Sequence, residues 1–97
     1  MKRSRLLITI TLATAALAGP LHAACYADYR ARMDNPFRLH YGVIALPDAD
    51  CSVAAAQPVI ASRIAAGGWA LLEVVSVFED SALEGKRQDA GDYFLRF

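Results

Sequence analysis

The first 23 residues constrain the fold most, because they are typical of an export signal and not of a folded domain. The segment starts with three basic residues among its first five, continues through an apolar or small-residue run over residues 6–21, and ends at Ala23. A membrane-spanning helix needs about 20 predominantly apolar residues, whereas this run is shorter and contains a Gly-Pro break. We predict a Sec-type signal peptide over residues 1–23, cleaved after Ala23, and one small domain over residues 24–97.

The signal predicts a location in the bacterial periplasm or outside the cell. Cys25 also suggests a lipoprotein, in which the cysteine becomes the acylated first residue, but His22 stands where that pattern requires Leu. We therefore favour a secreted or periplasmic protein over a lipoprotein, with no integral membrane segment after cleavage. Residues 24–97 hold seven basic and ten acidic side chains. This mildly acidic balance argues against nucleic acid or an anionic membrane surface as a partner.

Two cysteines remain in the exported chain, Cys25 and Cys51, and we predict that they form a disulfide. Disulfides form and persist in oxidising compartments. Closing a loop of about 27 residues would remove roughly 3.5 kcal/mol of unfolded-chain entropy. A domain this small gains a large share of its stability from such a bond.

The hydrophobic pattern predicts an α/β (α+β) fold with an N-terminal helix followed by β-α-β-β. Tyr26, Tyr29 and Met33 are spaced by three and four residues, which indicates a helix, and Ser52 is a candidate N-cap for the second helix. Pro58 either kinks that helix or starts it. The predicted elements in chain order are a helix over residues 26–33, a strand over 38–46, a helix over 52–66, a strand over 69–78, a polar loop over 79–91 and a strand over 92–97.

We expect a three-stranded sheet covered by one helix on one face. The two strands on either side of the second helix should be parallel through a crossover, and the last two strands should form an antiparallel hairpin. The other face would then expose apolar side chains, which either the N-terminal helix or a second subunit must cover. Candidate partner-binding residues are Trp69, Tyr41, Leu71 and Val75, although for Trp69 we favour a core position at the junction of helix and sheet.

Three segments carry a resemblance to a small family of uncharacterised exported bacterial proteins. They are Arg-Leu-His-Tyr-Gly-Val at residues 38–43, Gly-Gly-Trp at 67–69 with its following strand, and Tyr-Phe-Leu-Arg-Phe at 93–97. The resemblance covers nearly all of residues 24–97 and implies export and a strand-helix-strand-strand order. It implies no activity and no catalytic residues.

The sequence offers no catalytic or metal-binding cluster. His40 is the one histidine left after cleavage, and with both cysteines paired it has no partners for a tetrahedral zinc site. No serine lies in a nucleophile-elbow pattern, and the cysteines lack Cys-x-x-Cys spacing. We predict no cofactor, no metal and no catalytic residue. The favoured function is an exported binding or structural module that engages a protein partner or itself through an apolar sheet face. The alternative is a small secreted enzyme or enzyme inhibitor that uses His40 with loop carboxylates.

Overall fold

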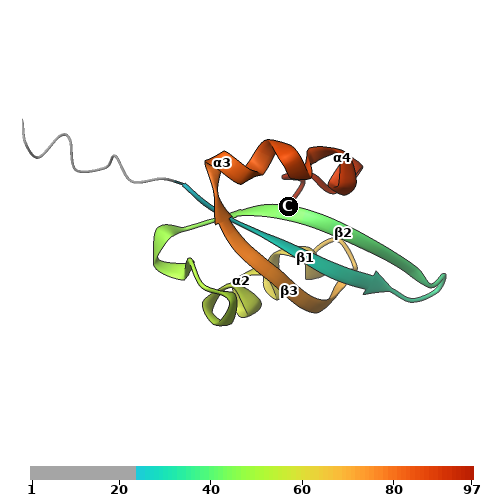
Figure 1. Cartoon of the computed structure of the whole chain (residues 1–97). Coiled ribbons are helices and arrows are strands. Elements are labelled where there is room, and N and C mark those ends of the chain that lie inside the picture. The colour runs from blue at the N-terminus through green and yellow to red at the C-terminus, as the bar shows by residue number, and fades with distance from the viewer. Residues whose placement is uncertain (1–23) are drawn as a thin grey trace, which may run out of the picture.

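The computed structural model describes residues 24–97, so the predicted signal peptide lies outside the described residues (Figure 1). The fold is α+β with a three-stranded antiparallel sheet, which confirms the predicted class and the number of strands. The helices and strands are β1 (Cys25–Met33), β2 (Arg38–Leu46), α2 (Val53–Ala65), β3 (Ala70–Glu79), α3 (Asp80–Leu83) and α4 (Arg87–Ala90), with short 3-10 turns at Asp48–Asp50, Glu84–Lys86 and Gly91–Tyr93.

The first element is a strand, so the helix predicted over residues 26–33 is wrong. Cys25, Ala27, Tyr29 and Ala31 are buried at every second position, which is the period of a strand. Small alanines carry half of this alternation, and the segment is rich in Ala, Arg and Met, which favour helices locally. Pairing with strands on both sides outweighs that local preference.

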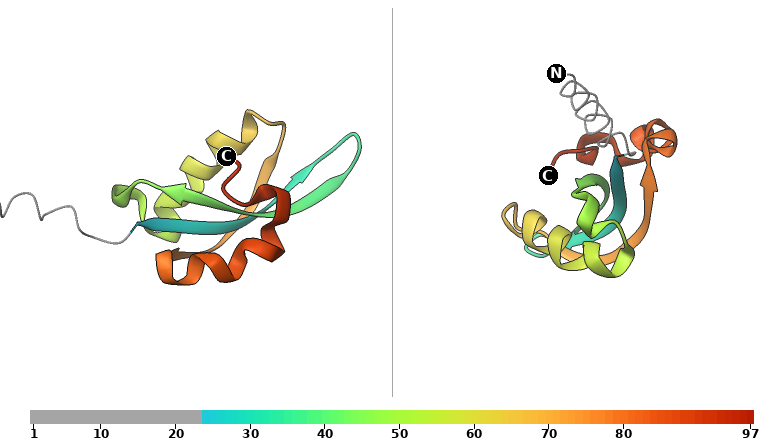
Figure 2. Two further views of the ribbon diagram at one scale, coloured as in Figure 1. Left: turned by 90° about the horizontal axis from the view of Figure 1, so that it is seen from above. Right: turned by 90° about the vertical axis from the view of Figure 1, so that its left-hand side faces the viewer.

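β1 is the central strand of the sheet, whose order is β2-β1-β3. It pairs antiparallel with both neighbours. β2 and β3 therefore run in the same direction, but they are separated by β1 and do not pair with each other. The predicted crossover through α2 therefore passes over β1, and the predicted hairpin between the last two strands does not form. The β1–β2 hairpin turns at residues 34–37 and projects beyond the helices (Figure 2).

The register of β3 against β1 slips twice. Asp28 pairs with Ser76 and Tyr29 pairs with Val74, so Val75 has no pairing partner on β1. A second slip, two residues further along β1, leaves Leu72 without a partner in the same way. Each slip is a β-bulge, at which one extra residue interrupts the ladder. The strict alternation of side chains between the two faces of the strand is therefore interrupted, and Leu72 and Val75 are exposed.

One face of the sheet packs against α2, and we call it the α2 face. Ala56, Ile60 and Ile64 form the buried stripe of the helix, at spacings of four. They meet the buried alternate residues of the strands in a core that includes Cys25, Ala27, Tyr29, Ala31, Ile44, Leu46, Trp69 and Val74. Val53, at the start of the helix, is exposed and lies outside this stripe.

The opposite face, which we call the C-terminal face, is covered in part by residues 80–93. This segment takes the place of the polar loop predicted over residues 79–91 and of the start of the strand predicted over 92–97. This segment is a chain of short helical turns that lies across the sheet on the side away from α2 (Figures 1 and 2). Lys86 forms an ion pair with the buried Asp28, and Val43 is fully buried. The cover expected from an N-terminal helix or a second subunit comes instead from the chain's own C-terminal part.

The C-terminal residues close the outer edge of β2 and do not form the predicted strand over residues 92–97. Phe94 makes a single parallel bridge to Val43, and the Leu95 amide donates to the Val43 carbonyl at 2.8 Å. Arg87 lies over the ring of Phe94. The outer edge of β2 is thereby occupied at Val43.

The predicted disulfide between Cys25 and Cys51 is present. It joins the first residue of β1 to the turn just before α2, with a sequence separation of 26 residues. The bond therefore holds the start of the central strand to the start of the helix that packs on it. Such bonds are typical of proteins that work in an oxidising, non-cytoplasmic compartment.

Candidate functional site

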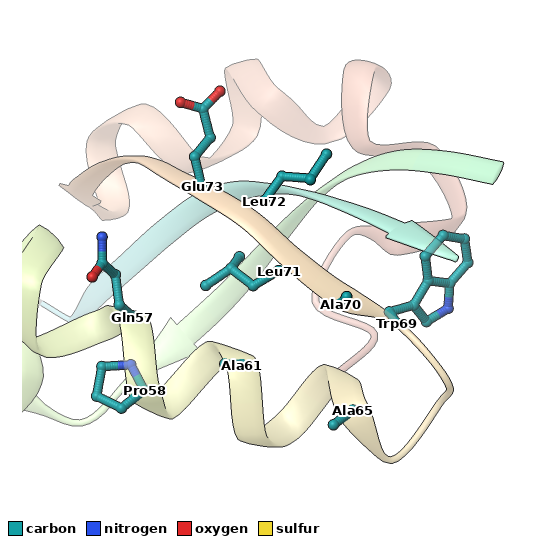
Figure 3. A pocket seen from close by; sticks show the side chains of 9 residues that line it. All are labelled: Gln57, Pro58, Ala61, Ala65, Trp69, Ala70, Leu71, Leu72 and Glu73. Carbon is teal, nitrogen blue, oxygen red and sulfur yellow. The ribbon is translucent and has the colours of Figure 1, made fainter. Parts of the chain in front are cut away.

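An open groove with a volume of about 750 Å³ lies between α2 and β3. Figure 3 shows its two walls, with Leu71 of β3 pointing towards the helix. The helix contributes small or short side chains, and Trp69 closes one end. The lining residues are Gln57, Pro58, Ala61, Ala65, Trp69, Ala70, Leu71, Leu72 and Glu73.

The groove exists because α2 presents small residues towards β3. Ala61 and Ala65 lie four positions apart, so they fall on one side of the helix next to the buried stripe. Methyl side chains leave space where longer ones would reach the strand. The spacing of four between the two alanines is visible in the sequence, but it indicates a groove only once the position of β3 is known.

Local signals at both ends fix where α2 begins and ends. The Ser52 hydroxyl accepts a hydrogen bond from the Ala55 amide at 3.0 Å, which confirms the predicted N-cap. Gly68 has a φ of 88°, the left-handed conformation that glycine adopts most easily after a helix. Pro58 lies inside the helix, on its exposed groove side, so the helix does not begin there.

β3 borders the groove with its unpaired edge. The strand order leaves one side of β3 without a neighbouring strand in the described part of the chain. Edge strands carry backbone amides and carbonyls that can pair with another chain. The groove and this edge share Ala70, Leu71 and Leu72. An extended segment placed in the groove would therefore have both an apolar floor and backbone partners.

The structure separates the four predicted partner-binding residues. Trp69 and Leu71 line the groove, with Trp69 only 7% exposed, so its ring is part of the core as well. Val75 is an exposed bulge residue further along β3. Tyr41 lies on the C-terminal face, where its hydroxyl donates to Asp28 at 2.7 Å.

His40 sits in a cluster of aromatic rings on the α2 side of β2. Its ring stacks on Tyr93 with centroids 3.7 Å apart and meets Trp69 edge-on at 4.2 Å. The polar contact of the ring is between Nε2 and the Tyr29 hydroxyl, 2.9 Å apart. Within residues 24–97, Nδ1 is buried without a hydrogen-bond partner. Burial, followed by the charge of Arg96, lowers the pKa of His40 to about 4.

This environment does not bring His40 together with the loop carboxylates. Asp80 and Glu84 belong to the helical segment on the other face, where Glu84 pairs with Arg87 at 2.5 Å. A neutral imidazole enclosed by rings also has little access to a substrate proton. The hydrogen bond of the His40 ring goes to the Tyr29 hydroxyl and not to either of these two carboxylates.

Asp28 is the centre of a buried polar network on the C-terminal face. Its carboxylate accepts hydrogen bonds from the hydroxyls of Tyr41 and Ser76, each at 2.7 Å, and lies 3.2 Å from Lys86 Nζ. Burial acts to raise the pKa of Asp28, but these three partners outweigh it and hold the pKa below its usual value. The network fixes the C-terminal segment on the sheet and leaves no part of Asp28 exposed for chemistry.

Comparison with protein-family models, with curated proteins and with solved structures gives no match for the chain. Among residues 24–97, no group of three or more His, Cys, Asp and Glu side chains is arranged to hold a metal ion. No helix in this part of the chain has the length and apolar character needed to cross a membrane. The site must therefore be interpreted from its own geometry.

Proposed function

We propose that the protein is an exported binding module that takes up an extended segment of a protein partner along β3. The observation that carries this proposal is the coincidence of an unpaired strand edge with an apolar groove of about 750 Å³. Strand addition at an open sheet edge is a common mode of peptide recognition, in which backbone hydrogen bonds give affinity and side-chain pockets give specificity.

The two sheet edges differ in a way that supports this mode. The β2 edge is bridged by Phe94 and Leu95 of the same chain, whereas the β3 edge lies beside Ala61 and Ala65. The bulges at Leu72 and Val75 restrict regular pairing to short stretches. The expected ligand is therefore a short extended segment with an apolar side chain directed at Leu71, and not a long strand.

A display library of random linear peptides tests the proposal. Selected peptides should bind the Ala61→Phe variant roughly tenfold more weakly, because the new ring fills the groove. The matched Ser62→Phe variant should bind as the parent does, since Ser62 is exposed on α2 and does not line the groove. Hydrogen exchange should show new protection at the outer amides of residues 70–73. Peptides that bind both variants equally, without this protection, would contradict the proposal.

A second copy of the chain is the other occupant of the same edge. Sedimentation should then show a concentration-dependent dimer that the Ala61→Phe variant abolishes and the Ser62→Phe variant retains. That result would assign the edge to self-association. A monomer at all concentrations agrees with a separate partner.

We also propose that residues 1–23 are removed during export to the periplasm or the cell exterior. The Cys25–Cys51 disulfide supports an oxidising destination, and the resemblance to exported bacterial proteins points the same way. The intact mass of the protein recovered from its producing cells should match residues 24–97 less two hydrogens. An uncleaved mass, an added lipid or free thiols would contradict this part of the proposal.

A further inference from the structure

A second hollow lies on the C-terminal face of the sheet, away from α2. It has a volume of about 350 Å³ and is lined by Arg30, Ala31, Leu39, His40, Tyr41 and Leu72. Residues 80–93 bury Val43 and Asp28 on this face but leave Leu39 61% and Leu72 51% exposed. The cavity therefore occupies the uncovered half of the face, between two leucines on opposite outer strands.

The cavity lies over the flat face of the sheet, with five of its six lining residues on β1 and β2 and the sixth, Leu72, on β3. β1 is paired on both sides, and β2 is paired with β1 and bridged by the C-terminal residues. The central strand β1 therefore offers no backbone partner in the middle of the cavity. The cavity suits a compact ligand held by side chains, and its volume falls at the lower end of the usual range for small-molecule sites.

Two arginines, Arg30 and Arg32, give the surface beside the cavity a positive charge. Arg30 still has hydrogen-bond donors that its ion pair does not occupy. Arg30 forms an ion pair with Glu73 through one terminal nitrogen, Nη2, and a guanidinium has five N–H donors in a planar fork. Arg32 is exposed two residues further along the same face of β1. A carboxylate is the group that a guanidinium binds most specifically, through two parallel hydrogen bonds.

We propose that this cavity binds a small apolar carboxylate. The hydrocarbon part lies between Leu39 and Leu72, and the carboxylate meets the donors of Arg30 that Glu73 leaves open. This binding site adjoins the groove beside α2, because Leu72 lines both hollows, but it lies on the other side of β3 from Ala61 and does not depend on the function proposed for the groove.

Octanoate and 1-octanol, which share a chain length and differ in charge, are suitable probes for NMR titration of the purified disulfide-bonded protein. Octanoate should bind roughly tenfold more tightly than octanol, as expected for one charge-assisted contact. The largest shifts should fall on the amides around Leu39 and Leu72. Equal binding of the two probes, or shifts that map elsewhere, would overturn the proposal.

Variants separate the two parts of the site. Arg30→Gln should remove the preference for octanoate over octanol, whereas Glu73→Gln should strengthen octanoate binding by releasing the guanidinium. Leu39→Asp changes an exposed residue and should weaken both probes roughly tenfold. Ala61→Phe, which fills the other groove, should change neither affinity. If Leu39→Asp leaves octanoate binding intact, the cavity is not the binding site.

Discussion

The Tyr29 side chain occupies the space directly above Gly42, its partner residue on the neighbouring strand. The two residues are paired in the β1–β2 ladder, and a Cβ atom placed on Gly42 would lie 2.5 Å from the Tyr29 hydroxyl oxygen. The glycine thus leaves room for a fully buried phenol that reaches across the strand to His40. Because residue 42 has no side chain, the Tyr29 ring can lie over the sheet and reach the aromatic cluster around His40.

Gly42→Ala should therefore displace Tyr29 and weaken its contact with His40. We expect the free energy of unfolding to fall by about 1–3 kcal/mol, as for other overpacked cores, measured by urea denaturation. Gly85→Ala is the matched control, because a Cβ atom at Gly85 would meet no atom within 4 Å. Equal stability of the two variants would show that the phenol can relocate freely, contrary to this packing.

The elements predicted correctly are those in which local pattern and tertiary role agree. The strand Arg38–Leu46 has the predicted bounds, and the helix Val53–Ala65 begins after the predicted cap and ends within one residue of the predicted end. Cap residues and glycine act through nearby backbone groups, so their effect can be read from a few neighbouring positions. The disulfide followed from the composition and the expected compartment.

The failures have a common physical cause, which is pairing between distant segments. β1 lies between two strands that come later in the sequence, so its own residues do not reveal its central position. Residues 80–93 lie on a sheet face, where Lys86 forms an ion pair with Asp28, a residue far away in the sequence. The groove was missed for a related reason: Ala61 and Ala65 form a site only through the space that they leave beside β3.

The disulfide should supply a large share of the stability. Replacing both Cys25 and Cys51 by Ser should lower the free energy of unfolding by about 3.5 kcal/mol, because the unfolded chain regains the entropy of an open loop. Urea denaturation of the variant and of the parent protein measures the difference. Adding reductant to the parent should reproduce the loss, while the variant should not respond. A parent protein indifferent to reductant would contradict this expectation.

Lys86 should be needed to keep the C-terminal segment on the sheet. In Lys86→Met the buried carboxylate of Asp28 loses its cation but keeps two hydroxyl donors. We expect a loss of about 1–3 kcal/mol in the free energy of unfolding near neutral pH. Arg32→Met, which removes an exposed charge, should change stability by less than about 0.5 kcal/mol.

The pH dependence of the same variant gives an independent check. The folded-state pKa of Asp28 is lowered, so the ionised carboxylate stabilises the fold above the unfolded-state pKa, and this stabilisation is lost as acid protonates it. The difference between Lys86→Met and the parent should therefore shrink at acidic pH. A difference that stays constant down to the acid transition would show that Lys86 acts through packing on Phe78 and not through Asp28.

His40 should make the fold less stable in mild acid. Its pKa is lowered from 6.5 to about 4, first by burial and second by the charge of Arg96. The unfolded chain therefore takes up the proton at a higher pH than the folded chain, and stability should decline progressively as pH falls from about 6.5 to about 4. NMR titration of the imidazole gives the pKa directly, and urea denaturation at several pH values gives the decline in the free energy of unfolding.

The control is His40→Phe, which retains an aromatic ring among Tyr93 and Trp69 but has no titrating group. The free energy of unfolding of this variant should depend less on pH across this interval. If the parent and His40→Phe show the same slope, another group is responsible, and if the imidazole titrates near 6.5, the ring is more hydrated than its enclosure by Tyr29, Trp69 and Tyr93 indicates.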